Sequence, residues 1–145
     1  MNLNIEQINN ILNDLWNFHL VLFGIGLSIF TLLYSFILNK RDELRGISEQ
    51  VKTGNNSPIL AQKESFAKRY IIRLKSANNH SAIIILITFI LFIISWTSQR
   101  IISNDCIDLK KLMLFSISAL TIIVVFYAIF IFMKVYKHYK QETKI

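Results

Sequence analysis

Cysteine, proline and glycine are scarce in this sequence, which has one cysteine, one proline and four glycines among 145 residues. A single cysteine, Cys106, excludes an intrachain disulfide framework and a cysteine-rich metal site. The long apolar runs contain no proline, and their only glycines are Gly24 and Gly26. The discontinuous helices that form substrate sites in many transporters therefore have little support.

Charge is missing from three long stretches, residues 16–38, 81–98 and 112–133. A helix of about 20 apolar residues crosses the roughly 30 Å hydrocarbon core of a bilayer. We therefore predict an all-α integral membrane protein with three transmembrane helices and the lipid bilayer as its surroundings. The segments that remain are too short for a separate soluble domain with its own core.

Motifs for catalysis are absent as well. The three histidines are isolated from one another, and the sequence has no metal-binding histidine pair, nucleophile elbow, phosphate loop or dinucleotide fingerprint. We expect no enzymatic activity, no metal site and no cofactor. His19 is the only titratable imidazole within an uncharged run, and we expect it at the membrane interface rather than in a proton relay.

Residues 1–39 contain no lysine or arginine, so we do not expect the first run to be a cleavable signal peptide, which begins with positive charge. In residues 1–15, Ile8, Ile11, Leu12 and Leu15 follow helical spacing. This pattern predicts an amphipathic helix on the membrane surface. A contact with a neighbouring subunit is the alternative.

Basic residues are concentrated in residues 39–80, which hold nine of the sixteen lysines and arginines, against three in 99–111 and four in 134–145. Cytoplasmic loops carry the excess of positive charge. We predict an N-out/C-in protein of the bacterial inner membrane, with 39–80 and the 134–145 tail in the cytoplasm and 99–111 as an outer loop.

The basic segment is predicted to be a helical hairpin. Residues 53–58 break the helical pattern, Ser57 suits a helix cap and Pro58 suits the first helical position. After the break, cations and aromatic residues occur together: Phe66, Lys68, Arg69, Tyr70, Arg73 and Lys75. Such a cluster is ordinarily an orientation signal attracted to anionic lipid. The alternatives are a cytoplasmic protein partner and a polyanion such as a nucleotide or oligonucleotide, whose bases can stack on aromatic rings.

Small and hydroxyl-bearing residues recur at helical spacing in two of the uncharged runs. The first run carries them at Gly24, Ser28, Thr31 and Ser35, and the second carries them at Ser81, Thr88 and Ser95. Small residues allow helices to pack closely, and hydroxyl groups bond across the interface. The pattern predicts either a helix-packing face or the lining of a pore in a homo-oligomer.

One stretch of the sequence has a layout known from another class of protein. It begins with the segment Phe66-Ala67-Lys68-Arg69-Tyr70-Ile71-Ile72-Arg73-Leu74-Lys75. An isoleucine-rich run follows, then a short loop, a further run and a tail rich in tyrosine and lysine. This layout, over about residues 60–145, resembles the SLATT class of membrane effectors in prokaryotic nucleotide-linked defence. The run at 16–38 is additional to the two-span pattern of that class. The resemblance implies an oligomeric, gated ion pathway or membrane-disrupting effector in anti-phage defence. A second resemblance, to three-span subunits of Tol/Exb-type motors, implies instead a non-conducting accessory or scaffold subunit.

Overall fold

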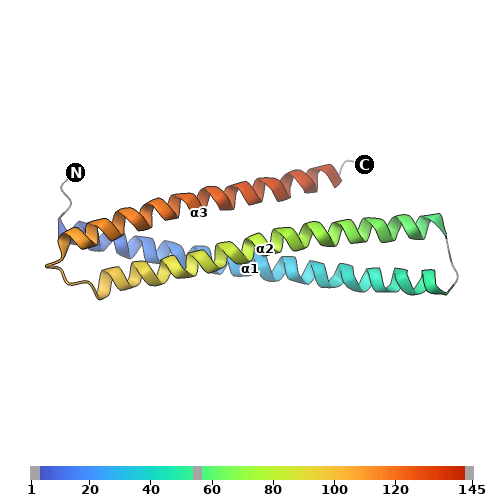
Figure 1. The fold of residues 1–145 in the computed structure, drawn as a ribbon, viewed down its shortest axis with the longest axis horizontal. Helices are drawn as coiled ribbons and strands as arrows, with labels where there is room; N and C mark the ends of the chain where they lie inside the picture. Colours follow the sequence, from blue (N-terminus) through green and yellow to red (C-terminus); the bar gives the residue numbers. More distant parts are fainter. Residues whose placement is uncertain (1–3, 54–56, 143–145) are drawn as a thin grey trace. The chain divides into compact units, whose positions relative to one another are not determined.

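The computed structural model describes residues 4–53 and 57–142, and their ordered secondary structure is entirely helical. There are three helices, α1 (Ile5–Lys52), α2 (Pro58–Arg100) and α3 (Ile107–Glu142) (Figure 1). Each helix is long and apolar enough to cross a membrane. The prediction of an all-α protein with three membrane-length helices is therefore confirmed.

The helices are much longer than a membrane crossing requires. They contain 48, 43 and 36 residues, which corresponds to about 72, 65 and 54 Å at about 1.5 Å per residue. α1 combines the predicted surface helix, the first run and the first arm of the hairpin. α2 combines the second arm with the second run. Since the hydrocarbon core is only about 30 Å thick, each helix has residues to spare beyond it.

The predicted break lies between α1 and α2. Ser57 Oγ accepts a hydrogen bond from Ile59 N at 3.3 Å, and Pro58 is the first residue of α2. Both assignments agree with the cap expected from the sequence. Residues 1–3, 54–56 and 143–145, which belong to the predicted surface helix, hairpin and tail, lie outside the described residues.

The connection between α2 and α3 is shorter than the predicted outer loop of 99–111. α2 continues to Arg100 and α3 begins at Ile107. Ser103 O accepts Cys106 N, and Cys106 O accepts Lys110 N, both at 3.1 Å. Lys110 and Lys111 therefore belong to the start of α3 rather than to a loop.

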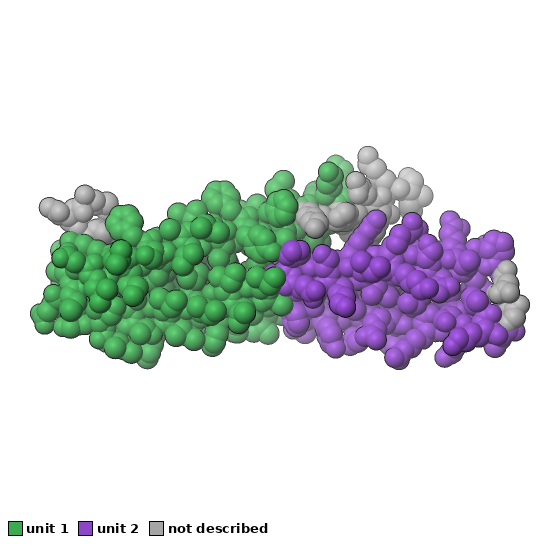
Figure 2. Space-filling model, in the orientation of Figure 1, with its two compact units in different colours: residues 1–27, 82–145 green, residues 28–81 purple. Residues whose placement is uncertain are grey.

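By its internal contacts the chain divides into two compact units (Figure 2). Unit 1 consists of Met1–Leu27 and Ala82–Ile145, so its helical part is a bundle of three segments. The rings of Trp16 and Phe92 meet edge to face at 6.0 Å. Phe23 and Phe89 lie 5.4 Å apart. From the first pair to the second, the residue number increases on α1 and decreases on α2, so the two segments are antiparallel.

The predicted surface helix belongs to the core of unit 1. Ile8 and Leu12 are fully buried in a cluster with Leu114 and Ile117, and the latter two lie in the third uncharged run. Helical spacing shows that one face of residues 1–15 is apolar, but it does not show what covers that face. Here Leu114 and Ile117 of α3 in the same chain cover it, and the assignment to the membrane surface stays a prediction.

Unit 2 consists of Ser28–Ser81, and it is an antiparallel hairpin of the second part of α1 and the first part of α2 (Figure 1). Of its described residues, the buried ones are Ile37, Ile47, Ala67, Asn78 and Ser81. Lys40 Nζ lies 5.7 Å from the centre of the Tyr70 ring, on the opposite arm. The predicted helical hairpin is therefore present.

Candidate ligand surface and buried polar interior

The residues predicted to bind an anion lie on α2 within unit 2. Four of them, Lys68, Arg69, Arg73 and Lys75, are exposed. The ring of Phe66 stacks on that of Tyr70, with the centroids 6.3 Å apart. Lys68 Nζ pairs with Glu64 Oε1 at 2.6 Å.

These residues occupy two sides of α2 rather than one. Positions 66, 69, 70 and 73 follow the spacing of one helical face, whereas 68 and 75 are two turns apart on another face. The aromatic pair therefore shares its face with Arg69 and Arg73 only. Lys40 of α1, which the sequence did not single out, joins this face through its contact with Tyr70. We call Lys40, Phe66, Arg69, Tyr70 and Arg73 the basic–aromatic surface.

The three hydroxyl residues predicted to share a face of α2 lie inside the chain. Thr88 and Ser95 are completely buried in unit 1, and Ser81 is buried in unit 2. Thr88 Oγ1 donates to the backbone one turn earlier, within 2.9 Å of both Ile84 O and Ile85 O. Ser81 Oγ likewise donates to Ala77 O at 3.1 Å. All three residues are therefore buried within one chain.

The corresponding residues of α1 behave differently. Gly24, Ser28, Thr31 and Ser35 are all exposed. A Cβ atom built on Gly24 meets nothing within 4 Å, whereas one built on Gly26 comes 2.8 Å from Ile85 Cγ1. The close approach of α1 and α2 therefore depends on Gly26, which lies outside the predicted stripe.

Comparison with known proteins assigns no family to this geometry. No protein-family model matches the chain, and no curated protein or solved structure is significantly similar to it.

The sequence analysis missed a buried lysine at one end of unit 1. Lys110 is 1% exposed, and its ammonium group donates to Asn9 Oδ1 at 2.9 Å, Asn104 Oδ1 at 2.8 Å and Gln99 O at 3.5 Å. A buried ammonium group needs such acceptors because desolvation of its charge is costly. Lys110 thereby joins the start of α1, the end of α2 and the connection before α3.

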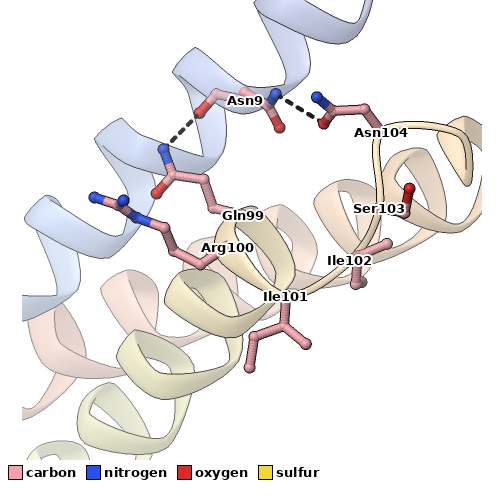
Figure 3. A pocket seen from close by; sticks show the side chains of 7 residues that line it. All are labelled: Asn9, Gln99, Arg100, Ile101, Ile102, Ser103 and Asn104. Atoms are coloured by element: carbon pink, nitrogen blue, oxygen red, sulfur yellow. Dashed lines mark hydrogen bonds between the residues drawn. The ribbon is translucent and has the colours of Figure 1, made fainter.

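A polar pocket of about 400 Å³ adjoins this lysine. It is lined by Asn9, Gln99, Arg100, Ile101, Ile102, Ser103 and Asn104 (Figure 3). Asn9 Nδ2 donates to Asn104 Oδ1 at 3.4 Å. Gln99 Nε2 lies 3.4 Å from both Asn9 O and Asn13 Oδ1. The pocket is thus lined by amide groups that the helices bring together. In the sequence, its only signal was the spacing of Asn9 and Asn13, which lie one helical turn apart.

His19 lies in the interior of unit 1, at 0% exposure. Its Nε2 is 3.1 Å from Thr121 Oγ1, and Thr121 lies near the middle of the third uncharged run. The expected position of His19 at the membrane interface stays a prediction. Counting along α1 alone could not reveal its burial against α3, because that burial depends on the register between helices.

The tautomer of His19 follows from its partner. Thr121 has one hydroxyl hydrogen and donates it to Ile117 O at 2.7 Å. Nε2 must then carry the hydrogen that it shares with Thr121 Oγ1, which leaves Nδ1 as an acceptor. Among the described residues, this buried Nδ1 has no hydrogen-bond partner. A buried polar atom without a hydrogen bond lowers the stability of the folded protein by about 1–3 kcal/mol. The unpaired Nδ1 of His19 therefore requires an explanation.

Proposed function

We propose that this chain is a multi-pass protein of the bacterial inner membrane that assembles into a homo-oligomeric, gated ion pathway or membrane-disrupting effector. The observation that carries the proposal is the exposure of α1. In its most apolar stretch 6% of residues are buried within the chain, against 28% in α2 and α3. α1 also presents Gly24, Ser28, Thr31 and Ser35, which favour close contact with another helix.

The large apolar residues exposed on α3 favour a lipid environment. Phe115, Phe126 and Phe132 of α3 are each about 70% exposed. Contiguous apolar surface of this kind is rare on water-soluble monomers. In our proposal α3 faces lipid, α1 faces the oligomer axis, and the excess of positive charge holds residues 39–80 in the cytoplasm with the N-terminus outside.

The basic–aromatic surface receives the trigger in this proposal. Arg69 and Arg73 would hold phosphates while Phe66 and Tyr70 stack on bases, a combination that suits a nucleotide or oligonucleotide. The layout shared with SLATT effectors is consistent with such a signal in anti-phage defence. A cytoplasmic protein partner or anionic lipid would use the same cations.

Paired charge reversals on opposite sides of α2 test the trigger. Arg69→Glu with Arg73→Glu should abolish any change in liposome ion leakage caused by a short single-stranded oligonucleotide, and oligonucleotide binding should fall steeply with added salt in the parent. Lys68→Glu with Lys75→Glu changes the net charge equally on the other face and should retain the response. Equal behaviour of the two variants would show that these cations serve orientation or lipid attachment only.

Leakage itself separates the pathway from the main alternative, a non-conducting scaffold subunit of a larger membrane complex. Purified protein in liposomes should release ions, and Thr31→Leu should reduce release while the oligomer remains assembled. Dissociation of the Thr31→Leu oligomer would assign the α1 stripe to helix packing. An assembled parent protein that releases no ions would favour the scaffold.

A further inference from the structure

Three buried acceptor atoms in unit 1 have no hydrogen-bond partner among the described residues. They are His19 Nδ1, Ser95 Oγ and Gln99 Oε1. His19 and Ser95 are both at 0% exposure. Buried polar atoms are nearly always paired with protein or with water, so three unpaired acceptors in one small bundle point to a ligand that supplies hydrogen.

The three acceptors follow one another along the bundle. Gln99 and Ser95 are four residues apart on α2, about 6 Å along the helix axis. Gln99 also lines the polar pocket (Figure 3). The contact of Trp16 with Phe92 fixes the antiparallel register and places His19, three residues after Trp16, about one turn or more beyond Ser95. The series thus leads from the pocket to the imidazole.

We propose that His19 is a buried proton-binding site, which water reaches from the polar pocket by way of Gln99 and Ser95. The proton binds at Nδ1, because Nε2 already carries the hydrogen that it shares with Thr121 Oγ1. The imidazolium then has two N–H donors, and Nδ1–H requires an acceptor. A water molecule held by Ser95 Oγ meets that need, since water both donates and accepts.

The α2 and α3 segments that surround His19 carry no charged side chain. Neither 82–98 of α2 nor 112–133 of α3 contains a charged side chain, and Tyr127 is the only other titratable group in these two segments. On α1 the nearest charged residue in sequence is Asp14. The pocket end carries charges of both signs, Arg100, Lys110 and Lys111 against Asp14, Asp105 and Asp108.

Nitrogen-15 NMR of the histidine-labelled full chain in lipid bilayers tests the site. At alkaline pH the His19 signals should show a protonated Nε2 and an unprotonated Nδ1, and on acidification both nitrogens should become protonated. His19→Gln should remove this set of signals. Should that variant fail to fold, replacing His80 and His138 by Gln instead leaves the His19 signals alone in the spectrum.

The route is tested by transfer of magnetisation from water to His19 Nδ1. Ser95→Ala should diminish this transfer, whereas Ser116→Ala, which removes an exposed hydroxyl from α3, should leave it at the parent level. A His19 that stays neutral while the other two histidines titrate in the folded protein would overturn the site, and so would hydrogen on Nδ1 at alkaline pH. Unchanged transfer in Ser95→Ala would overturn the route. None of these readouts requires ion conduction, so failure of the proposed pathway is a separate result.

Discussion

Two glycines separated by a single residue have opposite roles in α1. Gly26 faces α2 so closely that an added Cβ would lie 2.8 Å from Ile85 Cγ1, while Gly24 has open space around the same position. Ile85 is β-branched, so its Cγ1 atom cannot retreat without a change of rotamer or of helix separation. The contact between α1 and α2 is therefore limited by the size of one side chain.

We predict that Gly26→Ala destabilises unit 1 by about 1–3 kcal/mol, the usual cost of overpacking a well-packed contact. Gly24→Ala should be neutral or stabilising by up to about 1 kcal/mol, since alanine is the better helix former. Unfolding of the purified protein in detergent micelles measures both changes. Equal effects of the two substitutions would contradict the contact with Ile85.

Part of the buried polar interior of unit 1 could be predicted from the sequence. Thr88 and Ser95 were predicted to lie on one helix face because they are seven residues apart, and both are buried in unit 1. Lys110 was not anticipated, because a lysine beside a loop is usually solvated. Its burial depends on acceptors that folding brings to it, among them Asn9, which lies 101 positions earlier in the chain.

At the scale of elements, α1 unites three segments that the sequence analysis treated separately. Its apolar periodicity and its lack of proline predict a helix. Periodicity does not identify the helix that covers each face, because contacts depend on the register between elements that are distant in sequence. The same reasoning explains why the hairpin break at Pro58 was predicted correctly. The signals for that break are neighbouring residues in the sequence. The position of His19 depends instead on helices that are distant in sequence.

Ile8 provides the test at this scale. Ile8→Ala should lower the free energy of unfolding by about 2 kcal/mol or more, as expected for truncation of a buried isoleucine. Ile25→Ala is the matched control, because Ile25 lies on the same helix and is 52% exposed. Thermal unfolding in detergent would compare them. If residues 1–15 lay on the membrane surface, Ile8→Ala would leave the unfolding transition where it is in the parent.

For the whole molecule, the distribution of charge is the strongest guide to orientation. The net charge is +7, and most of the excess lies in unit 2 and the tail. The three cations near the α2–α3 connection oppose this bias. Lys110 among them is bonded within the bundle. The folded protein thus exposes less positive charge at this end than its sequence suggests.

Thiol labelling is the measurement that decides the orientation. Cys106 is free and exposed, so in the N-out arrangement a membrane-impermeant maleimide should modify it in intact cells. In a Cys106→Ser background, a cysteine at the exposed position Ser76 should react only after permeabilisation. The reverse pattern would place the basic–aromatic surface outside the cytoplasm and remove its access to a cytoplasmic signal.

The bonds of Lys110 also have a consequence for biosynthesis. Its acceptors come from Asn9, Gln99 and Asn104, and all three are translated before it. The ribosome thus completes the acceptor set just ahead of the ammonium group. A nascent chain in which α1 is displaced lacks the Asn9 acceptor and leaves the ammonium group with Gln99 O and Asn104 Oδ1 alone.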